Sequence, residues 1–168
     1  MFQSFSRRRS WRHLKRIMLI DLKSIPIGGL YLRGEEPPDI IGIDDPDIGF
    51  HLPIRYDIKA SLTKRTLLVR GRLEVEVQLT CSRCLKEFNE KIEVEDFDIR
   101  KEIDNPGETI DLTEDVRADI ILALPRKPLC EVDCPGICPS CGQDLNEGRC
   151  GCSADRSDSP FAGLSIDR

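Results

Sequence analysis

Closely spaced cysteines constrain this chain more than any other feature. Five of the eight cysteines lie in "CPGICPSCGQDLNEGRCGC", residues 134–152, and the other three are Cys81, Cys84 and Cys130. Two cysteines separated by two residues allow one tight turn to present both sulfurs to the same metal ion, and zinc binds four thiolates in a tetrahedron. We therefore expect the fold to gather these sulfurs in groups of four.

The first group can close locally. Cys138 and Cys141 form a C-x2-C pair, and Cys150 and Cys152 form a C-x-C pair after eight intervening residues. Four ligands for one zinc ion are thus available within a segment of fifteen residues. This spacing predicts a small zinc-ribbon-like segment.

The second group consists of the cysteines that the first leaves over. Cys81 and Cys84 fall at the turn between two predicted strands, the usual setting of a zinc knuckle, and Cys130 and Cys134 follow a predicted helix. We expect these four to complete a second tetrahedral site across the fold. Two closed four-thiolate sites leave no open coordination position, so we expect two structural zinc ions and no catalytic metal.

Other uses of the thiols are weaker interpretations. No run of about 18 apolar residues is present, and the apolar cluster at 17–20 is too short for a signal peptide, so we expect a cytoplasmic protein with few disulfides. A thiol-disulfide oxidoreductase is the alternative, although neither C-x2-C pair precedes a helix in a βαβ unit. An iron–sulfur cluster could use four of the thiols, but two compact groups of four favour zinc.

The charge of the chain disfavours general binding to polyanions. Residues 1–17 hold six basic side chains and no acid, whereas from Met18 onward 19 basic residues face 30 acidic ones, a net charge of −11. Each four-thiolate zinc site adds −2, which takes the total to about −15. We therefore expect a basic protein partner, with RNA contacts confined to local basic residues such as Arg83, Arg126 and Lys127. Together with Lys86 and Arg149, these residues lie beside the cysteines, where they could also offset part of the charge of the zinc sites.

Hydrophobic periodicity predicts an α+β fold. Apolar residues alternate with polar ones from Ile54 to Thr80 and again after Phe88, which is typical of half-buried antiparallel strands. A helix is predicted from Thr113, as N-cap, to Leu124, followed by a proline. We expect a strongly curled antiparallel sheet with one main helix and the zinc-ribbon-like segment at its carboxyl end.

The expected domain organisation has four parts. Residues 1–17 would be a basic, disordered extension, an RNA-contacting arm, a transit peptide or the product of an upstream start codon. Residues 18–134 would form the α+β core, 135–152 the zinc-ribbon-like segment and 153–168 a flexible tail. No paired-carboxylate, Ser/His or phosphate-loop signature indicates an enzyme or a small-molecule substrate, and no segment indicates a membrane partner.

Five motifs occur in a fixed order along the chain: "LTCSRCLKEF", "IDLTEDVRADIILALPRKPLC", "DCPGICPSCGQDLN", "CGC" and "SPFAGL". This ordered set resembles the YceD-type family of large ribosomal RNA subunit accumulation proteins. The resemblance covers most of the chain from about Met18 onward and is strongest from Leu79 to Cys152. Any single C-x2-C is a weak signal, but the set in this order is specific.

The resemblance implies a non-enzymatic factor needed for large-subunit (23S) ribosomal RNA to accumulate. Such a factor would bind a ribosomal RNA precursor, a large-subunit ribosomal protein, or both. A zinc-ribbon adapter in transcription is a further alternative. The resemblance gives Cys81, Cys84, Cys130 and Cys134 as the core cysteines of the family, while the other four belong to an extension that some members lack.

Overall fold

The computed structural model describes residues 18–105 and 107–152, so the predictions for the basic extension and for the tail lie outside the described residues. The described chain divides into two compact units. The first contains residues 18–79 and 88–126, and the second contains residues 80–87 and 127–152. Each unit is described by itself below.

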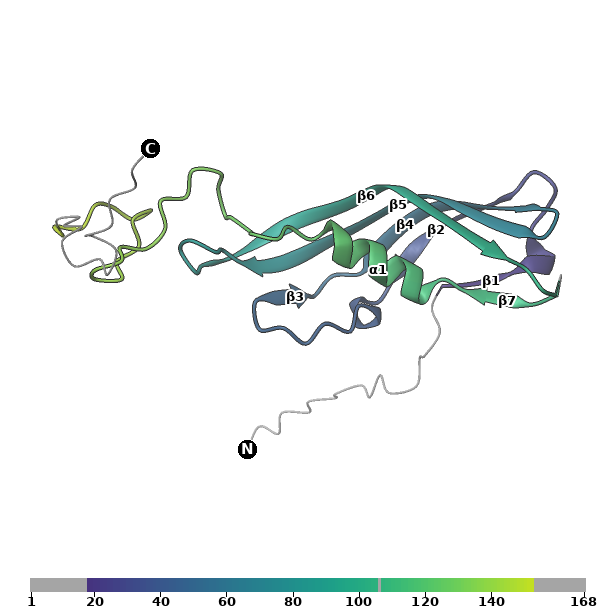
Figure 1. Ribbon diagram of the computed structural model, residues 1–168, viewed down its shortest axis with the longest axis horizontal. Helices are drawn as coiled ribbons and strands as arrows, with labels where there is room; N and C mark the ends of the chain where they lie inside the picture. Colours follow the sequence, from purple (N-terminus) through teal and green to yellow (C-terminus); the bar gives the residue numbers. More distant parts are fainter. Residues whose placement is uncertain (1–17, 106, 153–168) are drawn as a thin grey trace, which may run out of the picture. The chain divides into compact units, whose positions relative to one another are not determined.

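A five-stranded, mostly antiparallel sheet forms the first unit (Figure 1). Its strands are β2 (Leu30–Glu36), β3 (Ile48–Phe50), β4 (Ile54–Thr63), β5 (Thr66–Thr80) and β6 (Glu87–Glu102). The central strand β5 pairs with β4 along its first part and with β3 at Val77–Leu79, and it also pairs with β6. The predicted alternation is confirmed, because alternate residues of β4 and β5 are buried on one face.

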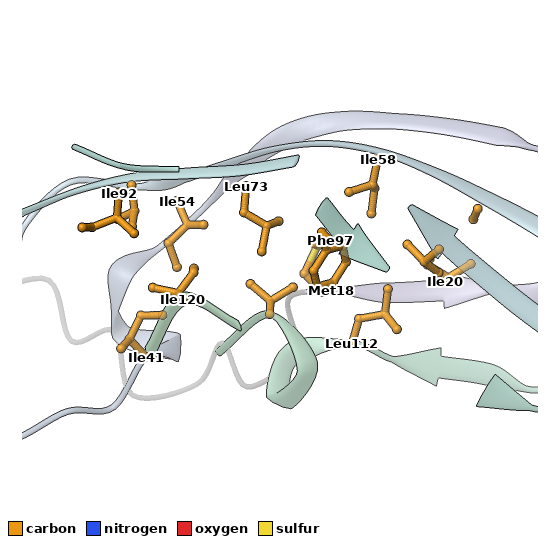
Figure 2. Packing of buried hydrophobic residues seen from close by; sticks show 14 of the residues in the cluster. Met18, Ile20, Ile41, Ile54, Ile58, Leu73, Ile92, Phe97, Leu112 and Ile120 are labelled. Atoms are coloured by element: carbon orange, nitrogen blue, oxygen red, sulfur yellow. The ribbon is translucent and has the colours of Figure 1, made fainter. Parts of the chain in front are cut away.

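One α-helix packs against the buried face of the sheet. This helix, α1 (Thr113–Ala123), contributes Val116 and Ile120 to the same hydrophobic cluster as Ile54, Leu73 and Phe97 (Figure 2). A two-stranded antiparallel sheet of β1 (Leu19–Asp21) and β7 (Thr109–Asp111) adds further apolar residues to this core. The structure thus confirms the α+β class.

The prediction of a strongly curled sheet is wrong. The β4–β5 ladder runs in continuous register from Arg55 opposite Glu74 to Thr63 opposite Thr66. Sharp bending of a sheet generally requires a bulge or a similar break in the ladder. Because this central ladder has no such break, the sheet does not curl strongly.

The start of the helix also differs from the prediction. Leu112, and not Thr113, occupies the N-cap position, and its side chain makes no capping hydrogen bond. The Asp111 carboxylate accepts a hydrogen bond from the backbone N–H of Thr113 at 2.9 Å, so an acceptor one residue earlier satisfies this donor. Among the described residues, no helix is long and apolar enough to cross a membrane.

A glutamate lies among the core residues. Glu36 ends β2 opposite Ile54, and only 8% of its surface is exposed. Burial disfavours the charged carboxylate and raises the pKa of Glu36 from 4.5 to about 7. Burial and the negative charge of Glu36 together raise the pKa of Tyr56 as well.

The buried glutamate predicts an unusual pH dependence of stability. In the unfolded chain Glu36 loses its proton near pH 4.5, whereas in the folded protein it keeps the proton until about pH 7. The folded state therefore binds more protons between these values, and the free energy of unfolding falls as the pH rises. We expect Glu36→Gln to be more stable than the wild type at pH 8, by up to about 3 kcal/mol, and equal to it at pH 4.

Urea unfolding of both proteins across this pH range measures the difference. Glu76→Gln on β5 makes the same chemical change at an exposed position and serves as the control. An equal effect of Glu36→Gln at pH 4 and pH 8 would contradict the expected protonation.

Candidate metal centres

The structure brings the cysteines together in two groups of four. One group contains Cys81, Cys84, Cys130 and Cys134, and the other contains Cys138, Cys141, Cys150 and Cys152. Within each group all four sulfurs lie within 4.8 Å of one another, and all eight cysteines are free thiols. Both groups belong to the second unit and match the grouping expected from the spacing. We call them the first and the second cluster.

The first cluster starts at the turn between β5 and β6. The backbone N–H of Cys81 donates to the carbonyl of Lys86, and the N–H of Leu85 donates to the carbonyl of Cys81, both at 2.9 Å. These two bonds fold residues 81–86 into a tight loop that presents the sulfurs of Cys81 and Cys84 on the same side.

The second cluster repeats this loop. The N–H of Cys138 donates to the carbonyl of Gln143, and the N–H of Gly142 donates to the carbonyl of Cys138, both at 2.8 Å. The positions in the two loops correspond one to one, so the chain contains two zinc-knuckle-like turns with the same backbone hydrogen bonds. Such turns are the usual way to present a C-x2-C pair to one metal ion.

The residue after the second cysteine of each loop has a left-handed backbone. Gly142 has a φ of 75°, and Leu85 has a φ of 62°. Glycine adopts this conformation at little cost, whereas a side chain such as leucine is strained there by about 1–2 kcal/mol. The first loop therefore has a residue that is strained in this conformation. Because the side chain of Leu85 is largely exposed, its burial offsets little of this strain.

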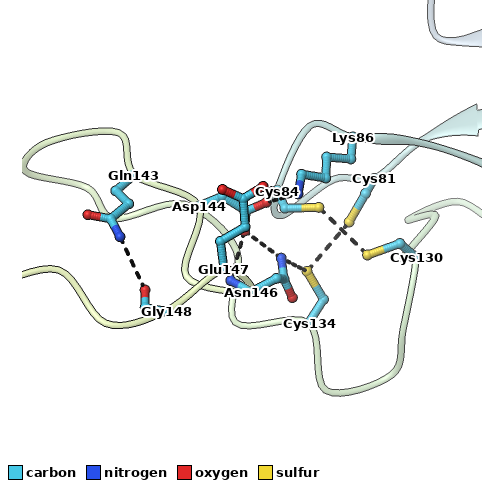
Figure 3. Close-up of polar contacts among 10 residues, drawn as sticks. All are labelled: Cys81, Cys84, Lys86, Cys130, Cys134, Gln143, Asp144, Asn146, Glu147 and Gly148. Carbon is cyan, nitrogen blue, oxygen red and sulfur yellow. Dashed lines mark hydrogen bonds and ion pairs between the residues drawn. The ribbon is translucent and has the colours of Figure 1, made fainter.

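The sulfur geometry of the first cluster suits a tetrahedral metal ion (Figure 3). The Sγ atoms of Cys81 and Cys134 are 3.8 Å apart, and those of Cys84 and Cys130 are 3.6 Å apart. A tetrahedron with metal–sulfur bonds of about 2.3 Å has sulfur–sulfur edges of about 3.8 Å. These distances are far too long for a disulfide and fit four thiolates around one ion.

The two clusters differ in exposure. Cys81, Cys84 and Cys134 are 5% exposed or less, and Cys130 is half-buried. In the second cluster Cys138 is buried, whereas Cys141 and Cys152 are exposed. Burial of the first cluster excludes water from its ligands, which strengthens the electrostatic attraction between thiolates and a cation.

The thiols within each cluster differ in pKa. Burial opposes ionisation of Cys81, but backbone N–H groups of Cys130, Cys84 and Arg83 outweigh it and lower the pKa of Cys81 to about 6. Burial, together with the neighbouring thiols, raises the pKa of Cys130 to about 12. The same contrast separates Cys138, with a pKa of about 6, from Cys152, with a pKa of about 12. Full ionisation of either cluster at neutral pH therefore needs a cation among the sulfurs.

The sequence indicated Arg83 and Lys86 as basic residues near the cysteines, but it did not indicate their partners or Asn146. Asn146 directs its amide nitrogen to the sulfur of Cys134 at 3.5 Å, and Arg83 donates to the carbonyl of Cys134 at 2.8 Å. Lys86 pairs with Asp144 and Glu147, at 2.7 and 2.8 Å (Figure 3). No spacing in the sequence predicts these contacts, so only the folded chain reveals them.

Comparisons with known proteins give one family. The family model described as "Large ribosomal RNA subunit accumulation protein YceD" matches residues 69–166, a range that includes all eight cysteines. An uncharacterized protein of Mycobacterium leprae is 29% identical over 119 residues, which are 62% of this chain and 55% of that protein. Uncharacterized proteins of Mycobacterium bovis and Mycobacterium tuberculosis are 33% identical over 122 residues, 64% of this chain and 59% of theirs.

The chain thus spans between half and two thirds of the length of these curated relatives. No solved structure matches the chain.

The left-handed backbone at Leu85 predicts a stabilising substitution. Leu85→Gly removes the strain at this φ and loses little apolar contact, because the leucine side chain is 63% exposed. With a metal ion bound at the first cluster, we expect its release to need more denaturant in this variant, by the equivalent of about 1 kcal/mol. A chromophoric chelator in a urea titration of the full chain measures the release.

Gly142→Leu is the matched opposite change in the second loop. It should ease metal release by a similar amount, because it places a leucine at a φ of 75°. Destabilisation by Leu85→Gly would show that the leucine side chain contributes more through packing than its backbone strain costs.

Proposed function

The chain belongs to the YceD family, and we propose that it is a non-enzymatic factor required for large-subunit (23S) ribosomal RNA to accumulate. The family match over residues 69–166 carries this proposal, because it contains most of β5, all of β6, the helix and both cysteine clusters. The description of the family concerns accumulation of ribosomal RNA and names no reaction. Binding, rather than catalysis, is the activity that such a description suggests.

Each cluster holds one structural zinc ion in this proposal. The ligands are Cys81, Cys84, Cys130 and Cys134 at the first site and Cys138, Cys141, Cys150 and Cys152 at the second. Sulfur–sulfur distances of 3.6 and 3.8 Å and two repeated knuckle turns support the assignment. Burial of Cys81 and Cys84 speaks against thiol-disulfide exchange, since redox-active thiols are generally accessible to their partners. Zinc binding would hold residues 80–87 against 127–152.

The solvent-facing side of the sheet is a poor surface for nucleic acid. Several of its basic side chains already lie beside carboxylates on neighbouring strands, as in the contact of Arg33 with Asp57 and the pairing of Arg70 with Asp98. Other ion pairs on these strands join Arg55 with Glu35 and Glu74, and Lys91 with Glu74 and Glu93. Phosphate contacts would have to compete with these pairs.

The favoured partner is therefore a basic ribosomal protein of the large subunit. From Met18 onward the chain has a net charge of −11, and two zinc-thiolate sites would make it about −15. An anionic surface attracts a basic protein and would shield it from unspecific contact with RNA before assembly. Direct contact with precursor RNA would then be limited to local basic residues.

Metal analysis tests the zinc assignment. We expect elemental mass spectrometry of the purified full chain to find two zinc ions per chain. Cys81→Ser with Cys84→Ser should reduce this to one, and so should Cys138→Ser with Cys141→Ser, because two serines leave each site without half of its ligands. Ser82→Ala and Ser140→Ala, one inside each loop, are controls that should keep both ions.

A metal-free chain with an unchanged fold and eight titratable thiols would refute the zinc assignment. It would favour the thiol-disulfide oxidoreductase. Red-brown protein with iron and inorganic sulfide would instead indicate an iron–sulfur cluster.

Depletion of the protein in its own cell tests the ribosomal role. We expect large-subunit ribosomal RNA to fall relative to small-subunit RNA, with precursors of the large subunit affected first. Quantification of both mature RNAs and their precursors by primer extension measures this. Expression of the wild-type chain from a plasmid should restore the ratio, whereas a chain with Cys81→Ser and Cys84→Ser should not.

Crosslinking in the complemented cells identifies the partner. Recovery of a basic large-subunit protein supports the proposed docking, and recovery of precursor RNA alone would overturn this part. An unchanged RNA ratio on depletion would overturn the ribosomal role itself, and association with RNA polymerase would favour a transcriptional adapter.

A further inference from the structure

The loop inside the second cluster, residues 142–149, contacts the first cluster. We propose that this loop forms the outer shell of the first metal site, with Asn146 as its positioning residue, so that metal bound at the second cluster strengthens metal binding at the first. The inference depends on both clusters binding metal and is independent of the ribosomal role. All residues involved belong to the second unit.

Asn146 links the loop to a ligand of the first cluster. Its side-chain nitrogen lies 3.5 Å from the sulfur of Cys134 and 2.6 Å from Oδ1 of Asp144. One amide group can donate one hydrogen to each acceptor. An N–H group directed at a metal-bound thiolate stabilises its negative charge and fixes the orientation of the sulfur, which is the usual role of an outer-shell residue.

Asp144 orients the side-chain amide of Asn146 and links it to the loop that carries Cys81 and Cys84. Its Oδ1 accepts hydrogen bonds from the backbone and the side chain of Asn146, while its Oδ2 lies 2.7 Å from Nζ of Lys86. Lys86 belongs to the Cys81–Cys84 loop, and its carbonyl accepts the N–H of Cys81. The Asp144 side chain is only 12% exposed, whereas that of Lys86 is 50% exposed, so the ion pair is shielded from water on the aspartate side.

Backbone contacts hold the start of the second cluster against the first. Ile137 donates to the carbonyl of Arg83 at 3.1 Å, and Leu145 donates to the carbonyl of Gly136 at 2.9 Å. Gly136 has a φ of 81°, and a Cβ atom there would lie 2.8 Å from the Arg83 carbonyl oxygen. Backbone hydrogen bonds therefore connect the segment that enters the second cluster with the Cys81–Cys84 loop of the first.

Metal at the second cluster would fix both ends of the loop that carries Asn146. The loop begins after Cys141 and ends before Cys150, and one ion binding both cysteines closes it. Closing the loop restricts its conformations and raises the fraction of time in which Asn146 faces Cys134. Thermodynamic linkage then requires metal at the first cluster to strengthen binding at the second by the same factor.

A comparison of metal affinities in full-length proteins measures this factor. Zinc competition with a chromophoric chelator gives the product of the two binding constants in the wild type. It also gives the single constants in Cys150→Ser/Cys152→Ser, which keeps the first cluster, and in Cys81→Ser/Cys84→Ser, which keeps the second. We expect the wild-type product to exceed the product of the single constants about 10-fold. A ratio within two-fold of one would overturn the coupling.

Asn146→Ala separates the proposed contact from a general loss of folding. In the wild-type background it should lower the product of the constants about 10-fold, and in Cys150→Ser/Cys152→Ser it should have little effect. In the part of the chain that the structure describes, the Gln143 side chain of the same loop donates to the carbonyl of Gly148 and to no sulfur, so Gln143→Ala should leave the product unchanged. Equal effects of Asn146→Ala in both backgrounds would show that Asn146 acts without the second metal and would overturn the proposal.

The outcomes also separate this inference from the zinc assignment. Two ions bound independently would overturn the coupling alone. A chain that binds no zinc would overturn both.

Discussion

Four thiols within 4.8 Å of one another cannot all ionise unless a cation lies among them, and the second unit contains two such groups. In the first cluster the cysteines come from the β5–β6 turn and from the segment after α1, which are 46 or more residues apart in the chain. Few apolar side chains are available in residues 127–152 to hold these segments together. Metal–thiolate bonds can replace a hydrophobic core in such small units, since binding free energy becomes folding free energy.

The two zinc-knuckle-like turns have the same backbone conformation, although different residues adopt it. Both loops use the same pair of hydrogen bonds, although one has Gly142 and the other Leu85 at the left-handed position. An exposed leucine holds a strained backbone conformation only where the surrounding contacts fix that conformation. In the first loop those contacts include the hydrogen bond from Ser82 to Pro128 and that from Ile137 to Arg83.

Local patterns made much of the fold predictable from the sequence. The alternation in β4 and β5, the helix and the grouping of the cysteines all depend on short-range spacing, and the structure agrees with each. The N-cap, the shape of the sheet and the burial of Glu36 depend on long-range packing, which no spacing encodes. Asn146 illustrates this limit, because its link to Cys134 exists only after both loops have formed.

The charge of the second unit favours a docking role for the metal-binding region. Residues 80–87 and 127–152 contain four basic and five acidic side chains, and two zinc-thiolate sites would bring their net charge to about −5. Lys86 forms ion pairs with Asp144 and Glu147, and Arg83 donates a hydrogen bond to the carbonyl of Cys134. Both basic side chains therefore already have partners beside the first cluster. The exposed side chains of this unit also include Glu131 and Asp133, the basic Lys127 and Arg149, and the thiols of Cys141 and Cys152. In the function proposed above, this net negative charge favours a basic protein segment over a phosphate backbone as the partner.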